Sequence, residues 1–182
     1  MILLLLADGF EEIEALCPLD ILRRLGSNIK TVGITGKRVT GAHGITVDAD
    51  LSPEEVPLSE IKHLILPGGM PGSSNLDISS YTDLFINTVL ENNGKIGAIC
   101  AAPFILGKRG LLKGKKAVCY PGFEDMLSGA EVLDKEYVVT DGNITTAKGM
   151  GVALSFAKRI AKEFLNLSDA RIDELSKTIM EK

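Results

Sequence analysis

The chain begins with seven apolar residues, and Asp8 and Gly9 bring this run to an end. A membrane span needs about 20 apolar residues, and a secretory signal normally places Lys or Arg before its apolar stretch. The run is too short for a membrane span, and it lacks the preceding basic residue of a secretory signal. Seven uninterrupted apolar residues instead predict a strand buried on both faces, which is typical of parallel sheets covered by helices.

Other apolar segments of strand length alternate with helical patterns. The predicted strands lie at residues 29–34, 64–66, 96–99, 117–119, 137–140 and 144–147. The predicted helices lie at residues 11–25, 80–90 and 152–165, with a last helix after Ser168 and a small hairpin at residues 39–47. This alternation predicts an α/β fold, flavodoxin-like, with a doubly wound and mostly parallel sheet and helices on both faces.

Composition narrows the class of protein. A length of 182 residues fits a single domain, residues 1–182. The formal net charge of −4 argues against a general nucleic-acid binder, which needs a basic surface. Three cysteines cannot complete a disulfide framework. We therefore expect a cytoplasmic protein with free thiols and with neither a membrane nor a specific nucleic acid as partner.

Cys100 is the first candidate functional residue. Ligands of a doubly wound sheet bind beyond the carboxyl ends of its strands, and Cys100 follows the predicted strand 96–99 directly. Small residues from Ala101 onward allow a helix to begin at once, similar to the nucleophile elbow of hydrolases. Backbone N–H groups and the helix dipole would then favour a thiolate. The alternative is a buried cysteine acting as a small hydrophobic residue.

Glu14 is the second candidate. It shares a helix face with the apolar residues three, four and seven positions further on, and that face should pack on the sheet. Burial would raise the pKa of its carboxyl, and the neutral acid could donate a hydrogen bond to a Cys100 thiolate. Glu11 and Glu12 have an ordinary explanation, since acidic residues favour a helix N-terminus. The alternative for Glu14 is a solvated side chain on a rotated helix.

The glycine pair Gly68-Gly69 follows another predicted strand. Glycines there let the backbone approach a ligand, and their N–H groups could form an oxyanion hole. A plain tight turn would have the same sequence. The segment supplies neither a Walker loop nor a G-x-G-x-x-G fingerprint, so no cofactor is expected.

The remaining histidines and cysteines give weaker signals. His43 lies in the predicted hairpin and His63 opens a predicted strand, and both are expected at the surface. A zinc site or a Cys-His pair is therefore poorly supported, and no metal is expected. Cys17 should be inert on the core face of its helix. Cys119 could lie near Cys100 as a resolving thiol, and both it and His43 are candidate auxiliary residues of the site.

Four segments together carry a family resemblance. They read ADGFEEIE at residues 7–14, LPGG at 66–69, AICAAP at 98–103 and KGMG at 148–151. In these segments and their order the chain resembles the DJ-1 family of the ThiJ/PfpI superfamily. The resemblance implies a flavodoxin-like homodimer in which Cys100 is the nucleophile and oxidation-sensitive thiol. It also implies that protonated Glu14 is its hydrogen-bond partner and that Gly69 and Ala101 supply backbone N–H groups.

The chain departs from that family's pattern in places. Many members carry a histidine where Tyr120 stands here, which argues against a Cys-His pair and makes the Tyr120 hydroxyl a candidate auxiliary group. The protease-like branch has histidine at the position of Ala101, which argues against a peptidase. Related glutamine amidotransferases use a distant histidine, and no histidine follows His63, which argues against a glutaminase.

The resemblance and the residues favour a cysteine-dependent stress-response enzyme. Its substrates would be small carbonyl compounds such as methylglyoxal, converted to lactate in the manner of glyoxalase III, or glycated thiols and amines that it would release as a deglycase. The alternative is a redox sensor or chaperone whose Cys100 oxidises to a sulfenic or sulfinic acid without obligatory turnover.

Overall fold

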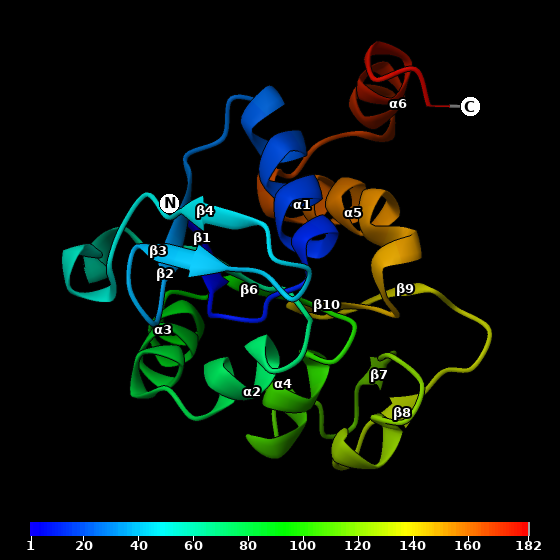
Figure 1. Cartoon of the computed structure of the whole chain (residues 1–182). Helices are drawn as coiled ribbons and strands as arrows, with labels where there is room; N and C mark the ends of the chain where they lie inside the picture. Colours follow the sequence, from blue (N-terminus) through cyan, green and yellow to red (C-terminus); the bar gives the residue numbers. More distant parts are fainter. Residues whose placement is uncertain (182) are drawn as a thin grey trace.

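A computed structural model describes residues 1–181 and shows one six-stranded sheet between two layers of helices (Figure 1). The strand order is β2-β1-β5-β6-β10-β9. The strands are β1 Ile2–Leu6, β2 Ile29–Gly33, β5 His63–Leu66, β6 Lys95–Ile99, β9 Val138–Asp141 and β10 Ile144–Ala147. Strands β2, β1, β5, β6 and β10 are parallel in the order of a flavodoxin-like sheet, which confirms the predicted fold class.

Helices cover both faces. One layer holds α1 and α5, with α6 packed on α5, and the other holds α2, α3 and α4 (Figure 1). The helices are α1 Glu12–Arg24, α2 Gly72–Asp77, α3 Ser80–Glu91, α4 Pro103–Lys108, α5 Ala153–Leu165 and α6 Asp169–Thr178. Successive residues of a strand point to opposite faces, so Leu4 packs with α1 and α5 while Leu5 packs with α3 and α4. The first strand is thus buried on both faces, as its sequence predicts.

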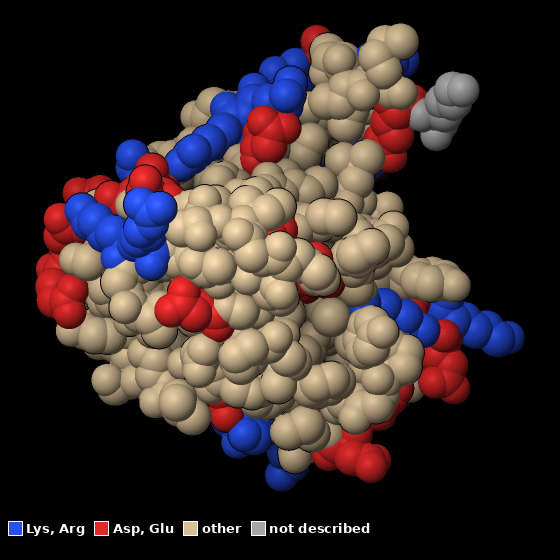
Figure 2. All heavy atoms as spheres, in the orientation of Figure 1, with Lys and Arg blue, Asp and Glu red and all other residues tan. Residues whose placement is uncertain are grey.

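Short elements complete the chain. The predicted hairpin is present as β3 Arg38–Thr40 paired with β4 Thr46–Asp48, and β7 Lys116–Ala117 pairs with β8 Glu131–Val132. Four 3-10 turns lie at Pro53–Glu55, Leu58–Glu60, Glu124–Met126 and Met150–Val152. Charged side chains gather toward the margins of the face in Figure 2, and its centre, over the hairpin and the start of α1, is largely uncharged.

One strand prediction needs correction. Residues 117–119 were expected in the series of sheet strands, but β7 ends at Ala117 and belongs to a separate two-stranded sheet. The strand predicted at 137–140 is present as β9, and it runs antiparallel to β10 because only Gly142 and Asn143 connect the two. Within residues 1–181, no helix combines the length and apolarity needed to cross a membrane.

The outer edge of β2 is covered by the chain after the hairpin. Leu51 forms an isolated parallel bridge with Val32, and its N–H donates to the Thr31 carbonyl at 3.0 Å. The Asp50 carboxylate accepts from the N–H of Thr31 at 2.8 Å and from Arg23 at 2.7 Å. The outward-facing N–H and carbonyl of Thr31, in the middle of β2, therefore have partners.

Candidate active site

Cys100 occupies a strained turn at the carboxyl end of β6. Its φ is 64°, in the left-handed region that residues other than glycine rarely adopt. Its N–H donates to the Ala147 carbonyl at 2.9 Å, and its carbonyl accepts from the N–H of Tyr120 at 2.8 Å. These two hydrogen bonds hold the turn. The helix was expected to begin at Ala101 but begins at Pro103, because the turn itself takes residues 100–102.

Glu14 enters the same place from the first turn of α1. Its side chain is buried, with 1% of the residue exposed. Its Oε2 accepts from the N–H of Gly68 at 3.0 Å, whereas its Oε1 has no hydrogen-bond partner among residues 1–181. A Cβ atom on Gly68 would overlap Glu14 Oε2 and lie 2.5 Å from the Cβ of Cys100. Gly68 is therefore what allows the carboxyl and the thiol to lie side by side.

Burial controls the protonation of this pair. It raises the pKa of Glu14 from 4.5 to about 7, against the opposing effects of the Cys100 thiol and the N–H of Gly68. Burial also raises the pKa of Cys100, to about 12, and the nearby Glu14 carboxylate adds to this effect. The sequence led us to expect a favoured thiolate. The structure instead gives a thiol that ionises only when Glu14 is neutral, because two adjacent negative charges would be buried together.

Two backbone N–H groups act in the opposite direction. Those of Ala101 and Gly69 lower the pKa of the Cys100 thiol, so they stabilise negative charge on the sulfur. Gly69 has a φ of 91°, and a Cβ atom there would lie 2.6 Å from the Gly9 carbonyl oxygen. Only glycine fits at this position. The β1 loop thus packs directly on the β5 loop behind the site.

Comparisons with known proteins show which family the chain belongs to. The sequence profile of the DJ-1/PfpI family matches residues 1–163. The chain belongs to the DJ-1/PfpI family. It is 33% identical to protein dj-1beta of Drosophila melanogaster, over 98% of this chain and 95% of that protein. It is 31% identical to a protein named deglycase from Thermococcus kodakarensis, over 88% of this chain and 97% of that protein. Among solved structures, a mutant DJ-1 superfamily protein from Salmonella typhimurium has a TM-score of 0.92 and 33% identity, covering 100% of this chain and 98% of its own.

Glu12 lies in the first turn of α1, as its sequence position predicts, and has a second role in this DJ-1/PfpI chain. It is buried, and its Oε1 accepts from the N–H of His43 at 2.8 Å. Its Oε2 lies 2.9 Å from the His43 Nδ1. Burial acts to raise the pKa of Glu12, but these hydrogen bonds outweigh it and lower the pKa. The only sequence signal for this role of Glu12 was that it is a second glutamate before Glu14. Its partner, His43, lies 31 residues away in the sequence.

His43 therefore ties the hairpin to the start of α1. Its side chain is exposed, and its hydrogen bond to Glu12, together with the charge of Glu11, raises its pKa. Ligand atoms of Glu11, Glu12 and His43 lie within 4.8 Å of one another, an arrangement that could hold a metal ion. Both carboxylate oxygens of Glu12 already interact with His43 of the hairpin, so the arrangement also has a purely structural explanation.

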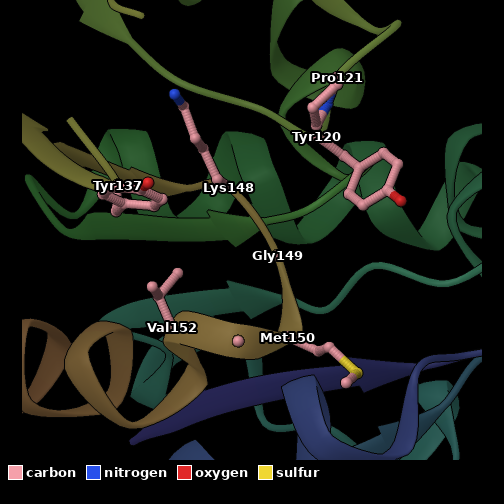
Figure 3. Close-up of a pocket in the computed structure, with 8 residues that line it drawn as sticks. Tyr120, Pro121, Tyr137, Lys148, Gly149, Met150 and Val152 are labelled. Atoms are coloured by element: carbon pink, nitrogen blue, oxygen red, sulfur yellow. The ribbon is translucent and has the colours of Figure 1, made fainter. Parts of the chain in front are cut away.

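The other singled-out residues lie as follows. Tyr120 is about half exposed, and its ring carbons, rather than its hydroxyl, face Gly149 (Figure 3). Cys17 is partly buried and Cys119 is buried, and burial raises the pKa of both thiols. His63 was expected at the surface, and this is wrong. It is buried, stacked on Phe164 with 4.5 Å between ring centroids, and burial lowers its pKa to about 4.

Proposed function

We propose that the chain is a cofactor-independent cysteine enzyme acting on small reactive dicarbonyls or on their early glycation adducts. The arrangement of Glu14 carries this proposal, because an unpaired carboxyl oxygen lies buried beside a partly exposed thiol. A pKa of about 7 lets the same carboxyl give and take protons near neutral pH. Several relatives bear the name deglycase, which supports the same class of activity.

In the glyoxalase reaction, the Glu14 carboxylate first accepts the proton of the Cys100 thiol. The thiolate adds to the aldehyde carbon of methylglyoxal, and the carbonyl oxygen takes the proton back from Glu14, giving a hemithioacetal. The N–H groups of Gly69 and Ala101 stabilise charge on the sulfur while the C–S bond forms.

Glu14 then completes a rearrangement of the hemithioacetal. Its carboxylate removes the proton from the former aldehyde carbon and returns it to the neighbouring carbon, while the hydroxyl proton moves to the second oxygen. The product is a thioester of lactate on Cys100. Water cleaves the C–S bond, and lactate and the free thiol are released. In the deglycase version, the same pair transfers the carbonyl fragment from a glycated thiol or amine to water.

A dicarbonyl turnover assay tests the proposal. We expect Cys100→Ala to abolish lactate formation from methylglyoxal and Glu14→Gln to lower kcat by about a hundredfold or more, because general acid–base catalysis is worth that much. Cys17→Ala is the matched control and should keep the parent rate, since Cys17 lies away from the site in the middle of α1. Parent-like lactate formation by Cys100→Ala would overturn the proposal.

A redox sensor or chaperone is the second candidate function. Cys100 is partly exposed beside two N–H groups, which could hold the oxygens of a sulfinic acid, whereas Cys119 is buried. Mild peroxide followed by mass spectrometry should then oxidise Cys100 before Cys17 and Cys119. Equal oxidation of all three thiols would contradict this function.

A further inference from the structure

A cavity of about 360 Å³ lies between two segments that are each linked to the Cys100 turn by a backbone hydrogen bond (Figure 3). One wall is the segment of Tyr120 and Pro121, the other is the segment 148–152, and Tyr137 closes one side. In Figure 3, Tyr120 and Tyr137 lie on opposite sides of Gly149, with Val152 and Met150 along the bottom. The lining is predominantly apolar and aromatic, as in small-molecule binding sites.

Both walls are attached to the backbone of Cys100. The N–H of Tyr120 donates to the Cys100 carbonyl, and the N–H of Cys100 donates to Ala147, the residue before the second wall. A Cβ atom on Gly149 would lie 3.3 Å from Tyr120 Cδ2 and 3.9 Å from Glu14 Oε1. Gly149, which lines the cavity, thus also lies close to the unpaired oxygen of Glu14.

The charge in the cavity is already engaged. Lys148 donates its Nζ to the carbonyl of Asp134 and lies 5.2 Å from the centroid of the Tyr137 ring. Among the lining residues, Lys148 is the only one with an ionisable side chain other than the two tyrosines. A neutral apolar group therefore fits this cavity better than a phosphate or a carboxylate does.

We propose that this cavity binds an aryl or other bulky apolar substituent of the carbonyl compound that reacts at Cys100. The inference rests on the proposed function and names its preferred substrates as aryl-substituted α-oxoaldehydes. The methyl group of methylglyoxal would leave most of the 360 Å³ empty. A phenyl ring can instead bury its area against Tyr120, Tyr137 and Val152, which favours binding in proportion to the apolar area removed from water.

The chemistry stays the same for the larger substrate. The Cys100 thiolate adds to the aldehyde carbon of phenylglyoxal, the C–S bond forms as the C–O double bond opens, and the oxygen takes the proton of Glu14. Transfer of the hydrogen to the neighbouring carbon and hydrolysis then give mandelate. The cavity holds only the ring, which takes no part in these steps.

The kcat/KM ratio of phenylglyoxal to methylglyoxal tests the inference. Val152→Phe fills the cavity, so we expect it to lower this ratio about tenfold. Because the two substrates differ in intrinsic reactivity, only the change in ratio between proteins is interpreted. Val132→Phe, on β8 and outside the cavity lining, is the matched control and should leave the ratio unchanged.

A second readout does not depend on turnover. Cys100 can be alkylated by iodoacetamide and by its N-benzyl derivative, and in both reactions the sulfur displaces iodide from the reagent. The rate of each alkylation can be followed by mass spectrometry. The parent should favour the benzyl reagent, and both Val152→Phe and Tyr137→Ala should reduce that preference. If Val152→Phe does not fold, Tyr137→Ala takes its place in the test. Tyr137 is 63% exposed, so its replacement should leave the fold intact.

The two proposals fail in different ways. Absence of dicarbonyl turnover with a benzyl preference that depends on Val152 would overturn the proposed function and keep the cavity as an apolar binding site. Suppose instead that the parent turns over methylglyoxal, and that the folded cavity variants change neither the kcat/KM ratio of the two substrates nor the ratio of the two alkylation rates. That result would overturn this inference and keep the proposed function.

Discussion

Glu12 and Glu14 lie two residues apart on one helix, are both buried, and have pKa values shifted in opposite directions. Glu12 receives hydrogen bonds from the hairpin, and these outweigh burial and lower its pKa. At Glu14 burial outweighs the effects of the Cys100 thiol and of the Gly68 N–H, and it raises the pKa to about 7. The balance between burial and hydrogen bonds thus sets the direction of each shift.

The raised pKa of Glu14 predicts a pH-dependent stability. The folded chain holds this proton more tightly than the unfolded chain, so the contribution is fully present below pH 4.5 and is lost as the pH rises through about 7. At about 1.4 kcal/mol per pH unit, this amounts to about 3 kcal/mol. Relative to the parent, Glu14→Gln should therefore gain about that much free energy of unfolding between about pH 5 and about pH 8, measured by urea denaturation.

The matched control for this experiment is Glu12→Gln. Because the pKa of Glu12 is lowered in the fold, its contribution is present above pH 4.5, and its replacement should destabilise the protein more at neutral than at acid pH. The two variants should thus respond to pH with opposite signs. If the difference in free energy of unfolding between Glu14→Gln and the parent did not change with pH, the fold would not raise the pKa of the Glu14 carboxyl.

Single residues were predictable where their signal is local. Glu14 stands out because a carboxyl occupies a core-facing helix position, and helix period is readable from neighbours. The burial of Glu12 and of His63 was not predictable from neighbouring residues, because their partners His43 and Phe164 lie 31 and 101 positions away in the sequence. Both residues were judged by their polarity, and a distant contact decided the outcome.

Four segments from separate elements meet where strands β1, β5, β6 and β10 end. That meeting place follows from the parallel arrangement, since the carboxyl ends of parallel strands share one edge of the sheet. The alternation of apolar runs and helical patterns was enough to predict it. The direction of β9 and the separate sheet of β7 were not predictable, because a short apolar run carries no information about its neighbours.

The contact between the β5 loop and α1 predicts the effect of one methyl group. Gly68→Ala would place its Cβ against Glu14 Oε2 and the Cβ of Cys100, pushing the two groups apart. We expect dicarbonyl turnover to fall at least about tenfold, because small displacements of reacting groups cost large factors. The loss in free energy of unfolding should stay at about 1–3 kcal/mol.

Gly151→Ala is the matched control for that substitution. A Cβ atom at Gly151 meets no atom within 4 Å, so turnover and stability should both remain at the parent level. Activity assays and urea denaturation on the same samples separate displacement of the site from loss of fold. Parent-like turnover by Gly68→Ala would mean that Glu14 and Cys100 need not be in contact.

Three exposed apolar residues of the molecule gather on one face. Ile13, Ile45 and Met150 come from three different elements, are each about half exposed, and line one cavity of about 260 Å³. Figure 2 shows few charges over the centre of the face that carries the hairpin and the start of α1. An apolar face of this kind is where a partner subunit gains most from burial.

We therefore expect a homodimer that covers this face. Ile45→Asp should raise the dimer dissociation constant by at least about tenfold, because it places a carboxylate among apolar contacts. Sedimentation equilibrium measures this directly. Ile78→Asp is the matched control, since Ile78 is 82% exposed and follows α2 away from the cavity. A monomeric parent at all concentrations would contradict the expectation.

The covering of strand β2 also affects how copies of this chain behave at high concentration. An open strand edge is a template on which another chain can add its own strand, and such additions lead to aggregates. Here Leu51 and Asp50 already occupy the outward-facing groups of β2. Polymerisation through this edge would first require the segment after the hairpin to detach, so the chain carries its own protection against aggregation on that side.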